Sequence, residues 1–92
     1  MKEVFPTTKF KKDLKKYSKQ ASKMEALLCI VNKLKQEQPI PAQFKPHILK
    51  GDYKGCWECH IEDDFLLIWV DDEIIELLRL GSHSELFGKK RR

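Results

Sequence analysis

Three short apolar runs, separated by acidic residues, constrain the fold of this chain more than any other feature. The runs cover residues 56–61, 64–70 and 73–80 and are rich in the aliphatic and aromatic side chains found in strands. The intervening Glu-Asp-Asp and Asp-Asp segments are short and polar enough to form turns. This pattern predicts three consecutive antiparallel strands joined as hairpins.

A short strand and a basic helix are predicted before this sheet. Residues 1–6 alternate weakly and end in proline, which suits a strand at a sheet edge. Thr7 or Thr8 is available as the N-terminal cap of the helix that follows, and lysines fill most of its surface. The apolar residues at helical spacing are Phe10, Leu14 and Tyr17.

A second helix is predicted to start near Lys23 and to end before Pro39. Residues 22–25, Ser-Lys-Met-Glu, have the sequence of a capping box. Residues 38–55 contain three prolines and two glycines without periodicity and are predicted to form a long loop. The apolar face of the second helix consists of Met24, Leu27, Leu28, Val31 and Leu34.

Together these elements predict a single α+β domain that spans residues 1–92. Its order is β-α-α-β-β-β, and the two helices pack on one face of a small, mainly antiparallel sheet of about four strands. A short helical turn follows the last strand and is capped by Ser82 or Ser84. Residues 88–92 are predicted to be a disordered basic tail.

The lengths of the two turns predict the strand register. A two-residue Asp-Asp loop at residues 71–72 places Val70 opposite Glu73 and Asp64 opposite Arg79. A three-residue loop at residues 62–64 keeps the apolar residues on one face, whereas a two-residue loop splits them. With the three-residue loop, the helix-facing residues are Trp57, Cys59, Ile61, Phe65, Leu67, Trp69, Ile74, Leu78 and Leu80.

That choice also decides which polar side chains share the other face. It pairs Ile61 with Phe65 and leaves Glu58 and His60 on the face away from the helices. Asp64 then lies near the turn. The register chosen for the core therefore gathers a histidine, carboxylates and an arginine on one surface.

Charge is distributed unevenly along the chain. Residues 1–23 hold eight lysines against two acids, whereas residues 56–92 hold five Lys or Arg against nine acids. A basic helix suits a polyanionic partner. No apolar run approaches the ~20 residues of a membrane span, and charges occupy the place of a signal peptide's apolar region. We therefore expect a cytoplasmic protein without a membrane partner.

The three cysteines are expected to be reduced thiols. Cys56, Cys59 and His60 form a C-x-x-C-H sequence, the pattern of haem attachment. In a strand, however, the two cysteines point to opposite faces and cannot grip one group together. We therefore expect neither a metal nor a cofactor.

The residues after the last strand suggest chemistry on a phosphate. Cleaving RNA without a metal requires a base for the 2′-hydroxyl, a cation for the charge at phosphorus and an acid for the leaving oxygen. Phe87 offers a flat face on which a base can stack. The candidate residues for acid, base and cation are His47, His60, Asp64, Arg79 and His83.

Three segments carry a resemblance to a known family. They are HILKGDYKG at 47–55, HIEDDFLLI at 60–68 and LLRLGSHSELF at 77–87. They resemble the YafQ branch of the RelE superfamily, the ribosome-dependent mRNA-cleaving toxins of bacterial toxin–antitoxin pairs. The resemblance implies an endoribonuclease acting on mRNA in the ribosomal A site, and a cognate acidic antitoxin as partner.

The resemblance also assigns roles to residues. It implies that His83 is the general acid and Arg79 the phosphate stabiliser, while His47, His60 and Asp64 remain alternatives for the base. The implied substrate-binding residues are Phe65, Phe87, Lys50 and Lys54. A non-catalytic module of the same fold, which only binds RNA or a protein, is the alternative function.

Overall fold

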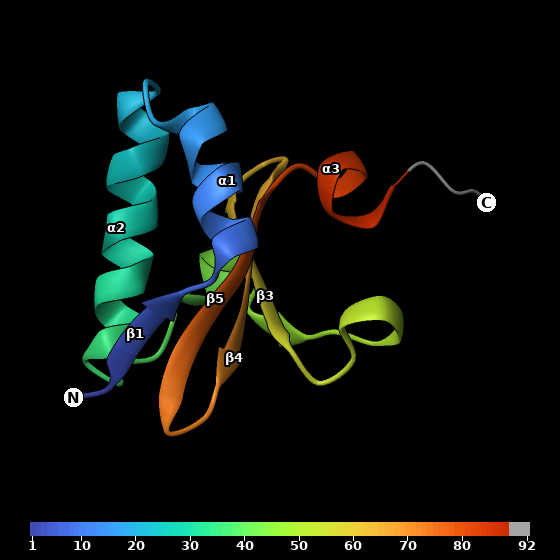
Figure 1. Cartoon of the computed structure of the whole chain (residues 1–92). Coiled ribbons are helices and arrows are strands. Elements are labelled where there is room, and N and C mark those ends of the chain that lie inside the picture. The colour runs from blue at the N-terminus through green and yellow to red at the C-terminus, as the bar shows by residue number, and fades with distance from the viewer. Residues whose placement is uncertain (89–92) are drawn as a thin grey trace.

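The structure, a computed structural model, describes residues 1–88 and contains three helices and one five-stranded sheet (Figure 1). The helices are α1 (Thr8–Tyr17), α2 (Ala21–Lys35) and α3 (His83–Phe87), with 3-10 turns η1 (Ala42–Phe44) and η2 (Gly51–Tyr53). The strands are β1 (Glu3–Pro6), β2 (His47–Ile48), β3 (Trp57–Glu62), β4 (Phe65–Asp71) and β5 (Ile74–Gly81). The predicted α+β fold is confirmed.

The sheet has the order β1-β5-β4-β3-β2, so β1 lies at an edge as predicted. β1 pairs with β5 in parallel, and the other neighbouring strands are antiparallel. The fifth strand, β2, falls in the segment predicted to be a loop. Its two residues pair with Trp57 and Glu58 of β3, which fixes His47 beside the sheet. The predicted tail, apart from Gly88, lies outside the described residues.

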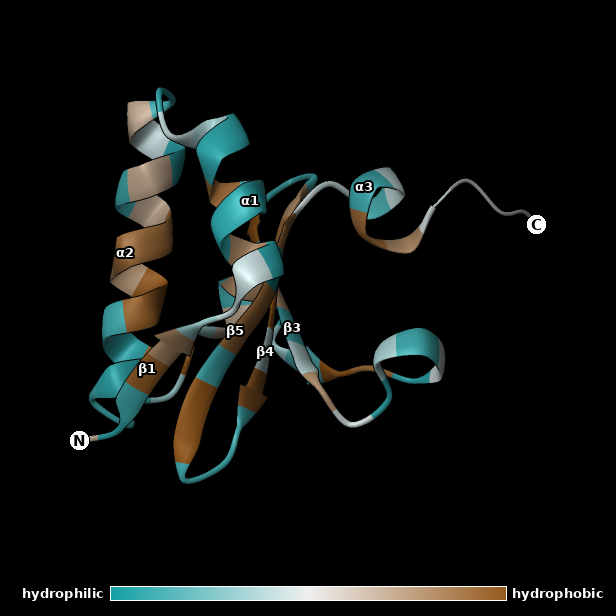
Figure 2. Cartoon of the chain, in the orientation of Figure 1, coloured by the Kyte–Doolittle hydropathy of each residue, from teal (hydrophilic) through white to brown (hydrophobic). Residues whose placement is uncertain are grey.

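Helices α1 and α2 cover one face of the sheet and enclose the main core (Figure 1). Figure 2 shows the strands mainly in hydrophobic colours and much of α1 in hydrophilic ones. The fully or nearly fully buried members of this core are Phe10, Leu27, Ile30, Leu34, Cys59, Ile61, Phe65, Leu67, Trp69, Ile75, Leu77 and Leu80.

The helix boundaries agree in part with the sequence prediction. Thr7 caps α1, because its hydroxyl accepts a hydrogen bond from the N–H of Phe10. The predicted capping box at residues 22–25 is wrong, because α2 begins at Ala21 and its N-cap makes no side-chain hydrogen bond. Leu28 is exposed and Ile30 is buried in its place, so the apolar face of α2 is rotated from the predicted one.

The register between β3 and β4 was predicted correctly along most of its length. Cys59 lies opposite Leu67, and His60 opposite Leu66. At the turn the prediction was wrong, since Glu62 rather than Ile61 pairs with Phe65. The strand accommodates this by a β-bulge between His60 and Glu62, which shortens the turn without moving the apolar face.

The predicted register between β4 and β5 was wrong. Val70 lies opposite Glu76 rather than Glu73, and Arg79 lies opposite Ile68 rather than Asp64. An irregularity between Ile68 and Trp69 adds one residue to β5. As a result, Ile75 and Leu77 enter the main core, Ile74 is exposed, and Leu78 packs on the other face.

A second, smaller cluster covers part of the face away from α1 and α2. Here the segment after β2 and helix α3 fold onto the sheet. The cluster contains buried Leu66, Ile68 and Leu86 with half-buried Leu49, Tyr53, Cys56, Leu78 and Phe87. This cluster holds the chain around η2 and α3 against the sheet. Within residues 1–88, no helix combines the length and apolar character needed to cross a membrane.

Candidate active site

Three histidines from three separate elements lie next to one another at the outer face of the sheet. β2 supplies His47, β3 supplies His60 and α3 supplies His83. The ring centroids of His47 and His60 are 6.2 Å apart, and those of His60 and His83 are 5.7 Å apart. The ring of Phe87 continues the row, 6.1 Å from His83. These four predicted site residues therefore form one continuous surface.

Asp64, in the turn between β3 and β4, binds the first residue of α3. One of its carboxylate oxygens accepts hydrogen bonds from the backbone N–H and from Nδ1 of His83, each at 2.9 Å. The backbone bond and the ring bond hold the pKa of the Asp64 carboxyl below its usual range. With Nδ1 engaged, His83 keeps Nε2 as its free ring nitrogen.

Glu58 is a buried carboxylate beneath two of the histidines. Its Oε1 lies 3.0 Å from His47 Nε2 and 3.8 Å from His60 Nε2. Its Oε2 has no hydrogen-bond partner among the described residues. The sequence placed Glu58 on this face but did not mark it as a site residue. Strand β2, which brings His47 to Glu58, has only two residues. It is too short to show a periodic pattern, so its pairing with β3 could not be predicted from the sequence.

Arg79, in β5, is held by two residues. Its Nε and Nη2 donate to the carboxylate of Asp13 in α1, at 2.7 and 3.2 Å. Its Nη1 donates to the hydroxyl of Tyr53 at 3.2 Å. The bonds to Asp13 raise the pKa of the guanidinium further above its ordinary value. Neither Asp13 nor Tyr53 was predicted to belong to the site.

The predicted substrate-binding residues do not all lie together. Phe87 is half-buried and meets Tyr53 edge to face, at 5.7 Å between ring centroids. Lys50 and Lys54 are exposed on either side of η2. Phe65, by contrast, is buried beneath α1 against Tyr17, so its ring is not available for stacking on a substrate.

Helix α3 is only five residues long and depends on several anchors. Ser82 caps it in a complete capping box with Glu85, which confirms one of the two predicted caps. The Glu85 carboxylate also accepts hydrogen bonds from the Tyr17 hydroxyl and from Lys16 Nζ in α1. The Tyr17 and Ser82 bonds lower the pKa of Glu85 to about 2. A Cβ on Gly81 would lie 2.5 Å from an oxygen of this carboxylate, so a larger residue at position 81 would displace the Glu85 side chain.

The two cysteines of the C-x-x-C-H sequence are separated as predicted. Cys59 is buried in the core beneath the helices, and Cys56 packs in the cluster on the opposite face. Burial raises the pKa of the Cys59 thiol to about 12. Among residues 1–88, no group of three or more His, Cys, Asp or Glu side chains is arranged to hold a metal ion.

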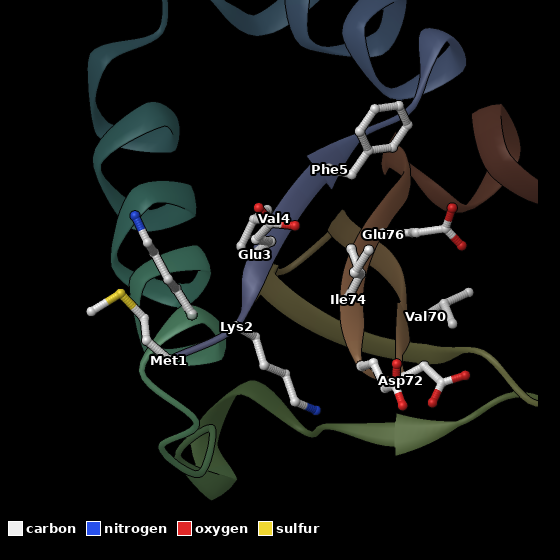
Figure 3. Close-up of a pocket in the computed structure, with 11 residues that line it drawn as sticks. Met1, Lys2, Glu3, Val4, Phe5, Val70, Asp72, Ile74 and Glu76 are labelled. Atoms are coloured by element: carbon white, nitrogen blue, oxygen red, sulfur yellow. The ribbon is translucent and has the colours of Figure 1, made fainter.

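The hollows of the surface are open. A groove of about 990 Å³ lies at the β1 edge, and Figure 3 shows its lining side chains, none of which is a predicted site residue. Two smaller hollows are lined by predicted site residues. One of about 310 Å³ is lined by His60 and Lys45, and one of about 520 Å³ is lined by Asp64 and Lys23.

Two helices on one face of a mixed five-stranded sheet, followed by a short C-terminal helix, form the fold of solved bacterial toxins. The chain belongs to the YafQ family within this class. The model of this family, described as the bacterial toxin YafQ of type II toxin–antitoxin systems, matches residues 2–88.

Individual relatives agree with this assignment. The mRNA interferase toxin YafQ of Escherichia coli strain K12 is 34% identical over 83 residues, which cover 86% of this chain and 88% of that protein. YafQ in the crystal structure of the E. coli DinJ–YafQ toxin–antitoxin complex is 31% identical, with a TM-score of 0.84 over 95% of this chain and 98% of that one. A metal-bound toxin from Helicobacter pylori is 40% identical, with a TM-score of 0.85 over 95% of this chain and all of that one.

Proposed function

We propose that this chain is an mRNA interferase, an endoribonuclease that cuts messages in the A site of the ribosome. The observation that carries the proposal is the convergence of His60, the Asp64–His83 pair and Phe87 on one surface. Arg79 is bonded to Tyr53, whose ring meets Phe87. The E. coli relative that bears the name mRNA interferase supports the same activity. The 2′-hydroxyl of the message attacks the adjacent phosphate, and the strand breaks at its 5′-oxygen.

His83 acts as the general acid. Asp64 occupies its Nδ1, which directs the other ring nitrogen toward the substrate. A proton on this nitrogen is delivered to the leaving 5′-oxygen. Arg79 stabilises the charge that develops on the phosphate.

His60 is the base that best fits the geometry. His47 Nδ1 donates to the carbonyl of Lys45 at 2.7 Å, and its Nε2 faces the Glu58 carboxylate, so neither nitrogen is free to take a proton. Asp64 is engaged twice by His83. His60 Nε2 lies 3.8 Å from the nearest carboxylate oxygen, beyond hydrogen-bond distance, and the ring lines an open hollow.

The shallowness of the site supports the proposed dependence on the ribosome. The hollows beside His60 and Asp64 are small and open, and a strand of RNA gains few contacts there. Bringing the 2′-hydroxyl into line with the phosphate costs conformational entropy, and binding elsewhere must offset this cost. The ribosome, which holds the message in the A site, provides that binding. Phe87, Lys50 and Lys54 contact the presented nucleotide.

The partner that controls the toxin is a cognate antitoxin, as the complex of the E. coli relative with DinJ suggests. The lysine-rich outer surface of α1 favours an acidic antitoxin.

A cleavage assay in a purified translation system tests the proposed function. The message is presented free or on programmed ribosomes, with the His83→Ala variant as the inactive control. We expect the message to be cut on programmed ribosomes and the free message to remain intact. Equal cutting of free RNA would contradict ribosome dependence. A folded wild-type protein that cuts neither substrate would favour the binding-module alternative.

A further inference from the structure

We infer that Asp13 is a positioning residue of the active site, which with Tyr53 holds the Arg79 guanidinium in the orientation needed for phosphate stabilisation. This inference rests on the proposed function and extends it to a helix that carries none of the histidines.

The first support is the burial of Asp13. It lies in the middle of a helix whose exposed positions are mostly lysine, yet only 9% of its surface is exposed. A carboxylate taken out of water needs compensating bonds. Asp13 has three: two from Arg79 and one from the backbone N–H of Leu80, at 2.9 Å. Its carboxylate is thus built into the end of β5, 66 residues away in sequence.

The second support is the orientation that these bonds impose. A two-point contact between a carboxylate and the guanidinium fork fixes the plane of the fork, which a single contact does not. The bond to Leu80 N–H ties the same carboxylate to the strand immediately after the irregularity that re-aims Arg79. The carboxylate that orients the Arg79 fork is therefore itself fixed to the backbone of the sheet.

The third support is what remains free. A guanidinium has five N–H groups, and Asp13 and Tyr53 engage three of them. The other two, one each on Nη1 and Nη2, are left for a phosphate. The ring of Tyr53 also meets Phe87 edge to face. Tyr53 therefore links the guanidinium, which donates to its hydroxyl, to the ring proposed to stack on a base.

A role for Asp13 in stability alone would predict a different pattern of rates, and a double-mutant cycle separates the two. The variants are Asp13→Asn, Arg79→Ala and the double variant, measured by single-turnover cleavage on programmed ribosomes at a temperature where all are folded. Asp13→Asn replaces one acceptor oxygen by a donor, so it breaks the two-point contact while keeping the shape. We expect the cleavage rate to fall about 10- to 100-fold, and to fall no further when the change is made in Arg79→Ala.

Two further variants complete the design. Leu34→Ala removes core packing beneath α2, away from the site, and is expected to lower stability at an unchanged rate. Tyr53→Phe removes only the hydroxyl and keeps the ring, so it is expected to slow cleavage a few-fold in the wild type and not at all in Arg79→Ala. Tyr53→Phe tests the same positioning of the Arg79 guanidinium if Asp13→Asn does not fold.

The outcomes are distinguishable. A wild-type rate for folded Asp13→Asn, or losses that add to those of Arg79→Ala, would overturn the positioning role; for Tyr53→Phe, the same two results would do so. An unchanged rate for Arg79→Ala would instead reject the proposed role of Arg79, and with it the proposed chemistry.

Discussion

The carboxylate of Asp64 accepts both the backbone N–H and the ring Nδ1–H of His83, each at 2.9 Å. The two residues are 19 positions apart, one in the β3–β4 turn and the other at the start of α3. The backbone bond satisfies one of the N–H groups that a helix start leaves without a partner. The ring bond fixes the orientation and tautomer of the imidazole. One carboxylate therefore anchors the helix and aligns the proposed acid.

Replacing His83 with alanine should reduce cleavage about 10²- to 10⁴-fold, the usual loss for a general acid. The ring is largely exposed, so the unfolding midpoint should move little. The pH–rate profile should lose its fall on the basic side, where neutral His83 no longer donates a proton. Single-turnover cleavage rates are measured across pH, and thermal unfolding is measured for the same proteins. A near wild-type rate for the folded variant would show that His83 is not the acid.

Asp64→Asn provides the companion test of alignment. An amide oxygen is a weaker acceptor than a carboxylate for the backbone N–H and ring Nδ1–H of His83. We expect a smaller loss of rate than for His83→Ala, because the ring is still present but is held less firmly. A wild-type rate for folded Asp64→Asn would argue against alignment of the acid by Asp64.

Glu58→Gln should slow cleavage about tenfold or more without lowering stability. The change keeps the volume of the side chain but removes a buried charge, one oxygen of which has no partner in the described residues. His47 Nε2 loses its carboxylate partner, and the carboxylate 3.8 Å from His60 Nε2 becomes a neutral amide. Cleavage rates and chemical unfolding would be compared with those of Glu62→Gln, a more exposed change on the same strand. A wild-type rate for Glu58→Gln would remove Glu58 from the site.

Glu85→Gln should lower the free energy of unfolding at neutral pH but not in strong acid. Bonds from Tyr17 and Ser82 lower the pKa of Glu85 in the folded protein to about 2, from an ordinary value of 4.5. The stabilisation from the ionised form is therefore complete above pH 4.5 and is lost as the pH falls toward 2. Urea unfolding of both proteins across this range gives the difference, with exposed Glu25→Gln as the control. A difference that stays constant down to pH 2 would contradict this linkage.

Replacing Cys56 and Cys59 together with serine should leave cleavage within a few-fold of wild type. Cys59 is fully buried, so a serine hydroxyl there should cost on the order of 1–3 kcal/mol of stability. The single Cys56→Ser variant, on the other face, should cost less. Stoichiometric zinc or a haem absorption band in the purified wild-type protein, absent from the double variant, would show that these thiols have a ligand.

The sequence alone determined the elements that depend on local patterns. The three apolar runs became β3, β4 and β5, each displaced from its predicted bounds by one residue. Thr7 and Ser82 cap helices because their hydroxyls reach N–H groups three residues ahead. The residues around His60 and His83 also carried the resemblance to the family that the comparisons confirmed. Apolar residues recur every two positions in a strand and every three to four positions in a helix. These spacings can be read from the sequence, so the elements could be predicted.

Tertiary structure decided how those elements meet. The register of β5 depends on a turn longer than predicted, since Asp71 pairs with Ile75, and on an inserted residue at Leu78. The sequence pattern reveals neither feature. Asp13 looked like one acid in a basic helix, yet packing buries it against Arg79. Phe65 had the spacing of the core and is buried there, although the resemblance assigned it to the substrate. Contacts between residues far apart in sequence arise from the packing of whole faces, so only the folded chain could bring Asp13 to Arg79 and Glu58 to His47.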